Sequence, residues 1–360
     1  MTGDVSRGIA GAVRHVRGLD TIRFVCALWV AIGHLGNPPL PEVIDKATTG
    51  GLLLRGIYNN LISAPAAVIV FFVISGICIH LPQATSNRIP CLRAFFVRRY
   101  ARIVLPMFAA MLLAQHVFGV RLALLENSIL WSLFAELVYY TIYPLLLFIR
   151  RAGISWQVLA ATAFVIALGV ASTNPTAGDY PSFGIGANWI LGLPCWLIGC
   201  VVAEKIQTTP PLEPGQPFIW TTRALTWLSS SVCSMLRFHT PIGYPWTLNV
   251  FAIGAGFWIL SETRFFAKTR PPALLEWGGT WSYSLYLAHP LAIASLKQFP
   301  MFETISLPLW IAAIVYVLSF SFLFACLFEF PSHKLARALA RRVQKSAKPD
   351  YGAALLRSGE

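Results

Sequence analysis

The sequence has few charged residues, and fewer acidic than basic ones. Only 12% of its 360 residues are Asp, Glu, Lys or Arg, with 15 acidic against 28 basic side chains, while 56% are hydrophobic. A single soluble core of this size could not bury so much apolar surface. The composition therefore excludes a soluble globular protein and indicates a polytopic membrane protein with lipid as its solvent.

Paired cysteines and metal-ligand spacings are also lacking. The seven cysteines lie mostly within apolar stretches and form no Cys-x-x-Cys pair. The pattern predicts neither a disulfide framework nor a metal site. No fixed-period repeat or low-complexity block divides the chain, so one membrane domain is expected. No cleavable secretory signal is evident, because Gly36-Asn37-Pro38-Pro39 follows the first apolar stretch in place of a small-residue cleavage site.

Long apolar stretches recur from one end of the chain to the other. A membrane-spanning helix needs roughly 20 mostly apolar residues. The sequence therefore predicts an all-α protein with about ten transmembrane helices. The weakest stretch contains Arg223 and a run of three serines. The predicted spans are 20–36, 63–81, 101–118, 129–149, 155–173, 185–203, 217–236, 246–261, 277–296 and 304–328.

The net charge of +13 would suggest a nucleic-acid partner in a soluble protein, but its distribution points to the membrane. If the amino terminus is cytoplasmic, 23 of the 28 Lys and Arg residues fall on the cytoplasmic side of the ten spans. This asymmetry predicts that both termini are cytoplasmic. We expect a cytoplasmic segment at 1–18, a transmembrane domain at 19–333 and a basic cytoplasmic tail at 334–360. The basic residues then contact lipid headgroups, and no nucleic acid is expected.

Two polar residues share one face of the first span. Arg23 and His34 are eleven residues apart, which returns to within about 20° of the same direction and places them about 16 Å apart along the helix. One elongated ligand could reach both, with an anionic end at Arg23 and a reacting end at His34. Imidazole suits the second role because it can take and return a proton near neutral pH. A capped interfacial histidine and an arginine that reaches the headgroups explain the same spacing equally well.

A cluster of arginines precedes the third span. Arg98 and Arg102 are one helical turn apart, and Arg99 and Arg102 are neighbours at i,i+3, so three guanidinium groups can converge. Arginine binds phosphate oxygens through forked contacts, which fits a cytosolic nucleotide-like anion. Such clusters beside a span are more often lipid anchors.

Three further ionisable residues lie in or near spans. Glu136 enters from the outer side and is expected about 9 Å deep, and His289 has passed the middle from the inner side. Both are expected to approach the depth of His34. A carboxylate within the membrane is typical of a functional site, whereas His289 could equally be a hydrogen-bonded histidine that bridges helices. Glu329 lies near the inner boundary, where a structural pair with an arginine is expected.

Taken together, these motifs resemble an integral-membrane family, acyltransferase family 3. They occur in the order of the family and cover residues 17 to about 335. They are the run from Arg17 to Arg23 leading to His34; Phe71 to Gly76; Arg99-Tyr100-Ala101-Arg102-Ile103 with Pro106; Trp131-Ser132-Leu133 with Glu136 and Tyr140; Ser282 to Tyr286 with His289; and Glu329 with Pro331.

The resemblance implies ten spans, a bacterial inner-membrane location and transfer of an acyl group from cytosolic acyl-CoA, commonly acetyl-CoA. The acceptor would be a hydroxyl of a carbohydrate, such as a polysaccharide or glycolipid, at the outer face. Oligomeric state is left open. The residues that would carry this activity are His34, Arg23 and Glu136 as catalytic; Arg98, Arg99, Arg102 and Ser75 as donor-binding; and Trp131, Tyr140, Tyr283 and His289 as acceptor-binding.

The sequence departs from the family after Glu136. Leu137-Val138-Tyr139-Tyr140 stands where the family often has a second acidic or amide residue followed by Phe-Tyr, which bears on acceptor specificity. The extracytoplasmic hydrolase-like domain of some members is not seen either.

The mechanism that we expect has His34 as general base for the acceptor hydroxyl, or less favourably as a transient acyl carrier, with Glu136 orienting or charge-balancing the imidazole. Two alternatives remain at this point. Arg23, His34 and Glu136 could form the path of a proton-coupled transporter, although no inverted repeat supports this. The second alternative is that the protein is a non-catalytic partner in envelope polysaccharide assembly.

Overall fold

The structure is a computed structural model, and it describes residues 16–39, 48–84, 91–119, 129–213, 217–302 and 306–346. All regular structure in these ranges is helical, which confirms the all-α prediction. The main helices are α1 (Leu19–Leu35), α2 (Thr49–Asn59), α3 (Ala64–Ala84), α4 (Leu92–His116), α5 (Leu130–Arg151), α6 (Trp156–Ser172), α7 (Gly184–Thr208), α8 (Phe218–His239), α9 (Tyr244–Lys268), α10 (Ala273–Gly279), α11 (Ser282–Leu296), α12 (Leu307–Phe324) and α13 (Phe330–Ser346). Short 3-10 turns η1 (Tyr180–Phe183) and η2 (Pro300–Phe302) and the π-helix η3 (Ala325–Glu329) complete the chain order.

Most predicted spans coincide with a helix, but the span 277–296 is divided between the end of α10 and α11, and not every helix is long and apolar enough to cross a membrane by itself. Within the described residues, five helical segments are long and apolar enough to cross a membrane. They are Thr49–Ala84, Leu130–Arg151, Tyr180–Thr208, Tyr244–Lys268 and Leu307–Gln344. The shorter α6 is apolar as well. Helices α1 and α11 have only 17 and 15 residues, and α4 and α8 carry arginines. The count of ten spans and the cytoplasmic placement of both termini therefore remain predictions.

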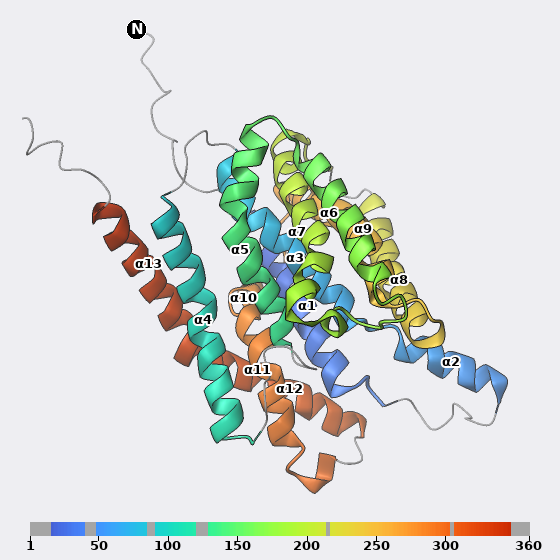
Figure 1. The fold of residues 1–360 in the computed structure, drawn as a ribbon. Helices are drawn as coiled ribbons and strands as arrows, with labels where there is room; N and C mark the ends of the chain where they lie inside the picture. Colours follow the sequence, from blue (N-terminus) through green and yellow to red (C-terminus); the bar gives the residue numbers. More distant parts are fainter. Residues whose placement is uncertain are drawn as a thin grey trace, which may run out of the picture.

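The structure adds helix where the sequence suggested loop or tail. Helix α2 lies within the expected outer loop at 37–62 and projects from the bundle in Figure 1. Helix α4 begins at Leu92 rather than 101, so the arginine cluster is helical. Helix α13 occupies the first half of the expected tail and lies beside α4, where its Ala336 and Ala340 are buried. Most of the segment 1–18 and residues 347–360 fall outside the described residues.

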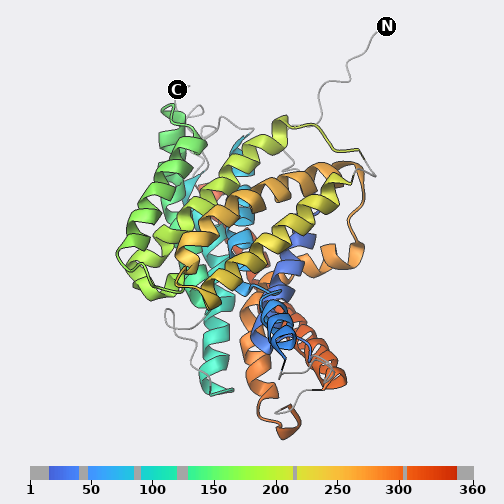
Figure 2. The same ribbon diagram turned by 90° about the vertical axis from the view of Figure 1, so that its right-hand side faces the viewer.

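Helix α3 lies in the middle of the bundle and packs against α1, α5, α7 and α9. Its closest approach is to α7, at Gly76 and Gly199. A Cβ atom on Gly76 would lie 2.0 Å from the carbonyl oxygen of Trp196, and one on Gly199 would lie 2.1 Å from that of Val73. Small residues that let two backbones meet are typical of membrane helix packing. On the side facing the viewer in Figure 2, α8 and α9 lie side by side.

Helix α1 is anchored at its amino-terminal end by α10. The carboxylate of Glu276 accepts hydrogen bonds from the backbone N–H of Gly18 (3.0 Å) and from the N–H (3.1 Å) and hydroxyl (2.8 Å) of Thr21. An acceptor is favourable there, because the first N–H groups of a helix have no partner within it. This contact fixes the helix that carries Arg23 and His34.

Candidate active site

A pocket of about 130 Å³ lies between α1, α3, α4, α5, α10, α11 and η3. Its lining combines charged and polar side chains, among them three arginines and two glutamates, with aromatic and aliphatic ones. The lining residues are Arg23, Val68, Phe71, Phe72, Ile74, Ser75, Cys78, Arg99, Arg102, Ile103, Ser132, Leu133, Glu136, Tyr140, Gly279, Ser282, Tyr283, Tyr286 and Glu329.

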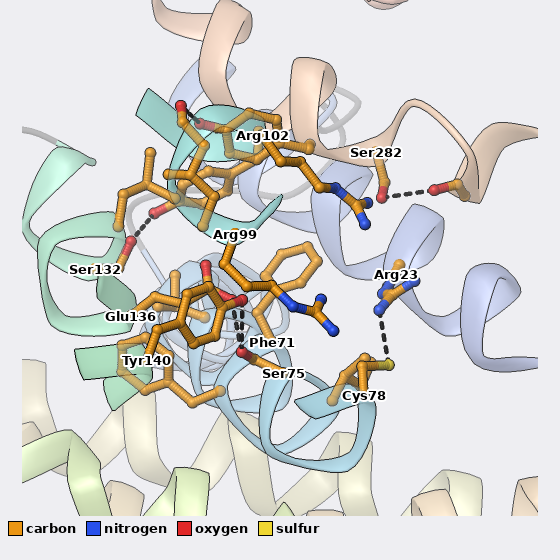
Figure 3. A pocket seen from close by; sticks show the side chains of 18 of the residues that line it. Arg23, Phe71, Ser75, Cys78, Arg99, Arg102, Ser132, Glu136, Tyr140 and Ser282 are labelled. Atoms are coloured by element: carbon orange, nitrogen blue, oxygen red, sulfur yellow. Dashed lines mark hydrogen bonds between the residues drawn. The ribbon is translucent and has the colours of Figure 1, made fainter. Parts of the chain in front are cut away.

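Three arginines from two helices converge on this pocket. Arg99 and Arg102 of α4 line it together with Arg23 of α1, and Figure 3 shows their guanidinium groups directed into the same space. Arg23 is fixed on two sides: its Nη1 donates to Asp20 Oδ1 (2.7 Å) and its Nη2 to Cys78 Sγ (2.9 Å). Asp20 is three residues before Arg23 on the same helix, a spacing at which side chains meet, whereas Cys78 comes from α3. The result is a cationic inner end suited to a polyanion.

Arg98 does not take part in this convergence. It is exposed and does not line the pocket, although it lies one residue from Arg99. Successive residues of an α-helix point about 100° apart, so only one of two adjacent side chains can face a given partner. The expectation that three arginines of α4 act together is therefore wrong for this conformation. The third arginine that lines the pocket is Arg23 of α1.

The opposite wall of the pocket holds a hydrogen-bonded carboxylate. Glu136 Oε1 accepts a hydrogen bond from Ser75 Oγ (2.6 Å) and a very short one from the Tyr140 hydroxyl. Ser75 Oγ in turn accepts from Trp196 Nε1 (3.2 Å). Figure 3 shows this group at one side of the pocket and Arg23 at the other, with Arg99 between them in the view. The cluster joins α3, α5 and α7 and holds the Glu136 carboxylate in one orientation.

From the sequence, Glu136 was expected to orient or charge-balance His34. The structure instead hydrogen-bonds Glu136 to other side chains. Its hydrogen-bond partners are Ser75 and Tyr140, and it lines the same pocket as the arginines. Its negative charge balances part of the positive charge of the pocket. Ser132, Glu136 and Tyr140 are spaced by four residues and so share one face of α5. That spacing is a signal by which Ser132 could have been found from sequence.

The expected acceptor-binding aromatics divide between the pocket and the core. Tyr283 lines the pocket, and its hydroxyl donates to the carbonyl of Ile103 (2.9 Å). Tyr140 lines it as described above. Trp131 does not: its ring packs against Phe72 and Tyr180, with centroids 5.9 and 5.7 Å away. Trp131 is thus a packing residue beside the site in this structure.

Glu329 also lines the pocket, and its hydrogen bonds come from Ser284 rather than from the arginine that was expected. It is 1% exposed, and its Oε2 accepts from the backbone N–H (3.0 Å) and hydroxyl (2.6 Å) of Ser284. Its Oε1 lies 3.7 Å from His333 Nε2. No arginine contact closer than 4.0 Å to this carboxylate is found among the described residues. Glu329 ends the π-helix η3, and such π segments frequently occur at functional sites.

The outer end of the pocket is closed by a tyrosine. The hydroxyl of Tyr286 lies 2.7 Å from Ser132 Oγ and donates to the carbonyl of Ile129 (3.0 Å). The ring of Tyr286 also makes an edge contact with Phe71, at 5.7 Å between centroids. These side chains separate the pocket from the next turn of α11. Sequence reasoning quoted Tyr286 only as part of a motif.

His34 and His289 meet just beyond this closure and outside the pocket lining. His289 Nε2 lies 3.2 Å from His34 Nδ1, and the two ring centroids are 4.9 Å apart. His289 is fully buried, whereas His34 is exposed. His289 is one helical turn outward from Tyr286, about 4.5 Å along the axis. The two histidines therefore do meet, as their depths suggested, and His34 remains accessible from the outer end.

No group of three or more His, Cys, Asp or Glu side chains in the described ranges could hold a metal ion. The site offers three arginine side chains, a hydrogen-bonded carboxylate and, beyond them, an exposed imidazole. A comparison with curated proteins and another with solved structures each found no match. The family model described as an acyltransferase domain matches residues 16–326, which includes every residue of the pocket except Glu329. The chain therefore belongs to acyltransferase family 3 and is a membrane acyltransferase.

Proposed function

We propose that the protein transfers an acyl group, in the first instance acetyl, from cytosolic acyl-CoA to a hydroxyl of a carbohydrate or glycolipid on the outer side of a bacterial inner membrane. The observation that carries this proposal is the order of groups along one path. Three arginines lie at the inner end of the pocket, and the exposed imidazole of His34 lies beyond its outer end.

The inner end of the pocket fits the phosphates of coenzyme A. Arg99 and Arg102 present forked donors that phosphate oxygens can accept, and Arg23 adds a third cation held in place by Asp20. A cavity of about 130 Å³ is too small for the whole donor, so the nucleotide lies at the arginine end and only the thioester arm enters. Arg102 remains exposed, which leaves this end open to the donor.

The distance between the two ends matches the length of an elongated donor. Arg23 and His34 are eleven residues apart on the straight helix α1, which corresponds to about 16 Å. The pantetheine arm of coenzyme A separates its phosphates from the thioester on this scale. Tyr286 and Phe71 lie between the two ends, so the arm must displace the Tyr286 ring before the thioester reaches His34.

The reaction then needs a base but no resident cofactor. His34 Nε2 takes the proton of the acceptor hydroxyl while the hydroxyl oxygen forms a new bond to the thioester carbonyl carbon. The carbon–sulfur bond breaks, and the departing thiolate takes the proton back from His34. The products are the ester and free coenzyme A, and His34 returns to its neutral state. Glu136 lies in the donor pocket, where it balances the arginines when no donor is bound.

The test is turnover by purified protein in lipid nanodiscs, supplied with labelled acetyl-CoA and envelope glycans as acceptors. His34→Ala should lower turnover by about 10²- to 10⁴-fold, the usual contribution of a general base, and leave coenzyme A affinity unchanged. Mass spectrometry of glycans from cells with and without the gene would identify the acceptor. Near-normal turnover by His34→Ala would overturn the assignment of the base.

A further inference from the structure

The two histidines at the outer end of the site are linked into a chain of hydrogen bonds. His289 Nδ1 lies 3.1 Å from the carbonyl oxygen of Leu285, and His289 Nε2 lies 3.2 Å from His34 Nδ1. His34 Nδ1 also lies 2.9 Å from the carbonyl oxygen of Val30. Both carbonyls belong to the preceding turn of the same helix as the histidine. The contact between α11 and α1 in this chain is therefore made by the two imidazole rings, and a backbone carbonyl lies at each end.

These contacts specify where the protons are. A carbonyl oxygen can only accept, so His289 Nδ1 must carry a hydrogen to bond Leu285. A neutral imidazole has one N–H group, and His289 Nε2 is then an acceptor. The hydrogen between the rings consequently belongs to His34 Nδ1, which shares it between Val30 and His289. His34 Nε2 is left with a free lone pair.

We infer that His289 is a positioning residue that holds His34 in the Nδ1–H tautomer, with Nε2 bare and ready to accept a proton. The inference rests on the proposed function, because it assigns the partner of the proposed base. In soluble enzymes a carboxylate usually orients the catalytic imidazole. A neutral imidazole performs this task at lower cost within a membrane, where a buried carboxylate is expensive.

The surroundings of His289 keep it neutral. It is fully buried and packs against Tyr286, with ring centroids 6.1 Å apart. Its ring nitrogens lie within hydrogen-bond distance of the Leu285 carbonyl and of His34. A protonated His289 would direct an N–H at the N–H of His34 and break the contact. When His289 is neutral, its Nε2 accepts a stronger hydrogen bond once His34 gains a proton, because the Nδ1–H of an imidazolium is a stronger donor than that of a neutral imidazole.

The first test compares substitutions that differ in reach. In His289→Gln the amide oxygen can occupy the place of Nε2 and accept from His34. In His289→Asn the amide ends near the place of Nδ1, which reaches Leu285 but not His34. We expect Gln to retain kcat within about 10-fold, and Asn and Leu to lose about 10- to 100-fold, as is typical when a group that orients a ligand or base is removed. KM for acetyl-CoA should stay unchanged in all three, since the donor binds at the arginines.

The second test reads the tautomer directly and does not depend on turnover. Nitrogen-15 chemical shifts of histidine-labelled protein in nanodiscs distinguish an Nδ1–H ring from an Nε2–H ring, and His34→Gln assigns the signal by its loss. We expect pure Nδ1–H at His34 in the wild-type chain and in His289→Gln, and a mixture in His289→Leu. Size-exclusion elution and coenzyme A binding show that each variant is folded.

The outcomes separate this inference from the proposed function. A His34 signal that stays pure Nδ1–H in His289→Leu, or is Nε2–H in the wild-type chain, would overturn the role of His289. Equal kcat for the Gln, Asn and Leu variants would do the same. The predicted tautomer in a protein without acyl-transfer activity would support the hydrogen-bond chain and count against the acyltransferase mechanism.

Discussion

The hydroxyl of Ser75 on α3 donates to the carboxylate of Glu136 on α5 across 2.6 Å, and this bond ties the two helices together at the pocket that also contains the arginines. Tyr140 supplies a second donor to the same oxygen. Because Glu136 lines the same pocket as Arg99 and Arg102, the cluster holds a carboxylate in place among these arginines. It is the part of the site in which stability and function are most closely joined.

We predict that Tyr140→Phe lowers the free energy of unfolding by about 1–3 kcal/mol, because a hydrogen bond to a half-buried carboxylate is lost. Thermal denaturation in detergent would measure the effect. The matched control is the same change in a Glu136→Gln background, where the acceptor is uncharged and the loss should be smaller. Equal losses in both backgrounds would show that Tyr140 does not stabilise the carboxylate.

Coenzyme A binding should distinguish the arginines of α4. Arg99→Gln and Arg102→Gln should each weaken binding by about 10- to 100-fold, the range for one charge-assisted hydrogen bond. Arg98→Gln is the matched control, since Arg98 is exposed and outside the pocket, and it should change affinity by less than about 2-fold.

Titration calorimetry on protein in nanodiscs would measure these affinities. The differences should narrow at high salt, because ions screen the contribution of partly exposed charges. If Arg98→Gln weakened binding as much as Arg99→Gln, the donor would be held by general surface charge and not by the pocket.

The orientation of the chain predicts opposite labelling at two exposed positions. Gly50 on α2 has no atom within 4 Å of an added Cβ, and Arg341 on α13 is exposed. In intact cells, an impermeant maleimide should label Gly50→Cys and should label Arg341→Cys only after the membrane is opened. The unsubstituted chain, with its seven native cysteines, gives the background. Labelling of both positions from the same side would contradict the proposed topology.

The contact between α3 and α7 should not tolerate a methyl group. Gly76→Ala would place a Cβ 2.0 Å from the Trp196 carbonyl, which forces the helices apart and should cost about 1–3 kcal/mol or more. Gly254→Ala in α9 is the control, because nothing lies within 4 Å of its added Cβ, and alanine favours a helix by up to about 1 kcal/mol. Thermal unfolding of the two variants should shift in opposite directions. A neutral Gly76→Ala would show that the two helices are not in close contact.

Arguments that stay within one helix were the most successful from sequence. The Arg23–Asp20 ion pair follows from i,i+3 spacing and is present at 2.7 Å. The depths of His34 and His289 follow from helical rise, and the two residues do meet. Predictions that needed the relation between helices were less reliable. Arg98 and Trp131 lie outside the pocket, and Glu136 contacts Ser75 rather than His34.

The sequence by itself determined that the chain is helical, apolar and built around a few ionisable side chains at membrane depth. Those properties follow from composition and from periodicity along one helix axis. Only the tertiary structure decided that Arg23 joins Arg99 and Arg102, and that His289 is the partner of His34. The reason is physical: periodicity gives the angle of a side chain around its own helix, whereas the rotation of that helix against its neighbours depends on close packing, such as the contact between Gly76 and Gly199.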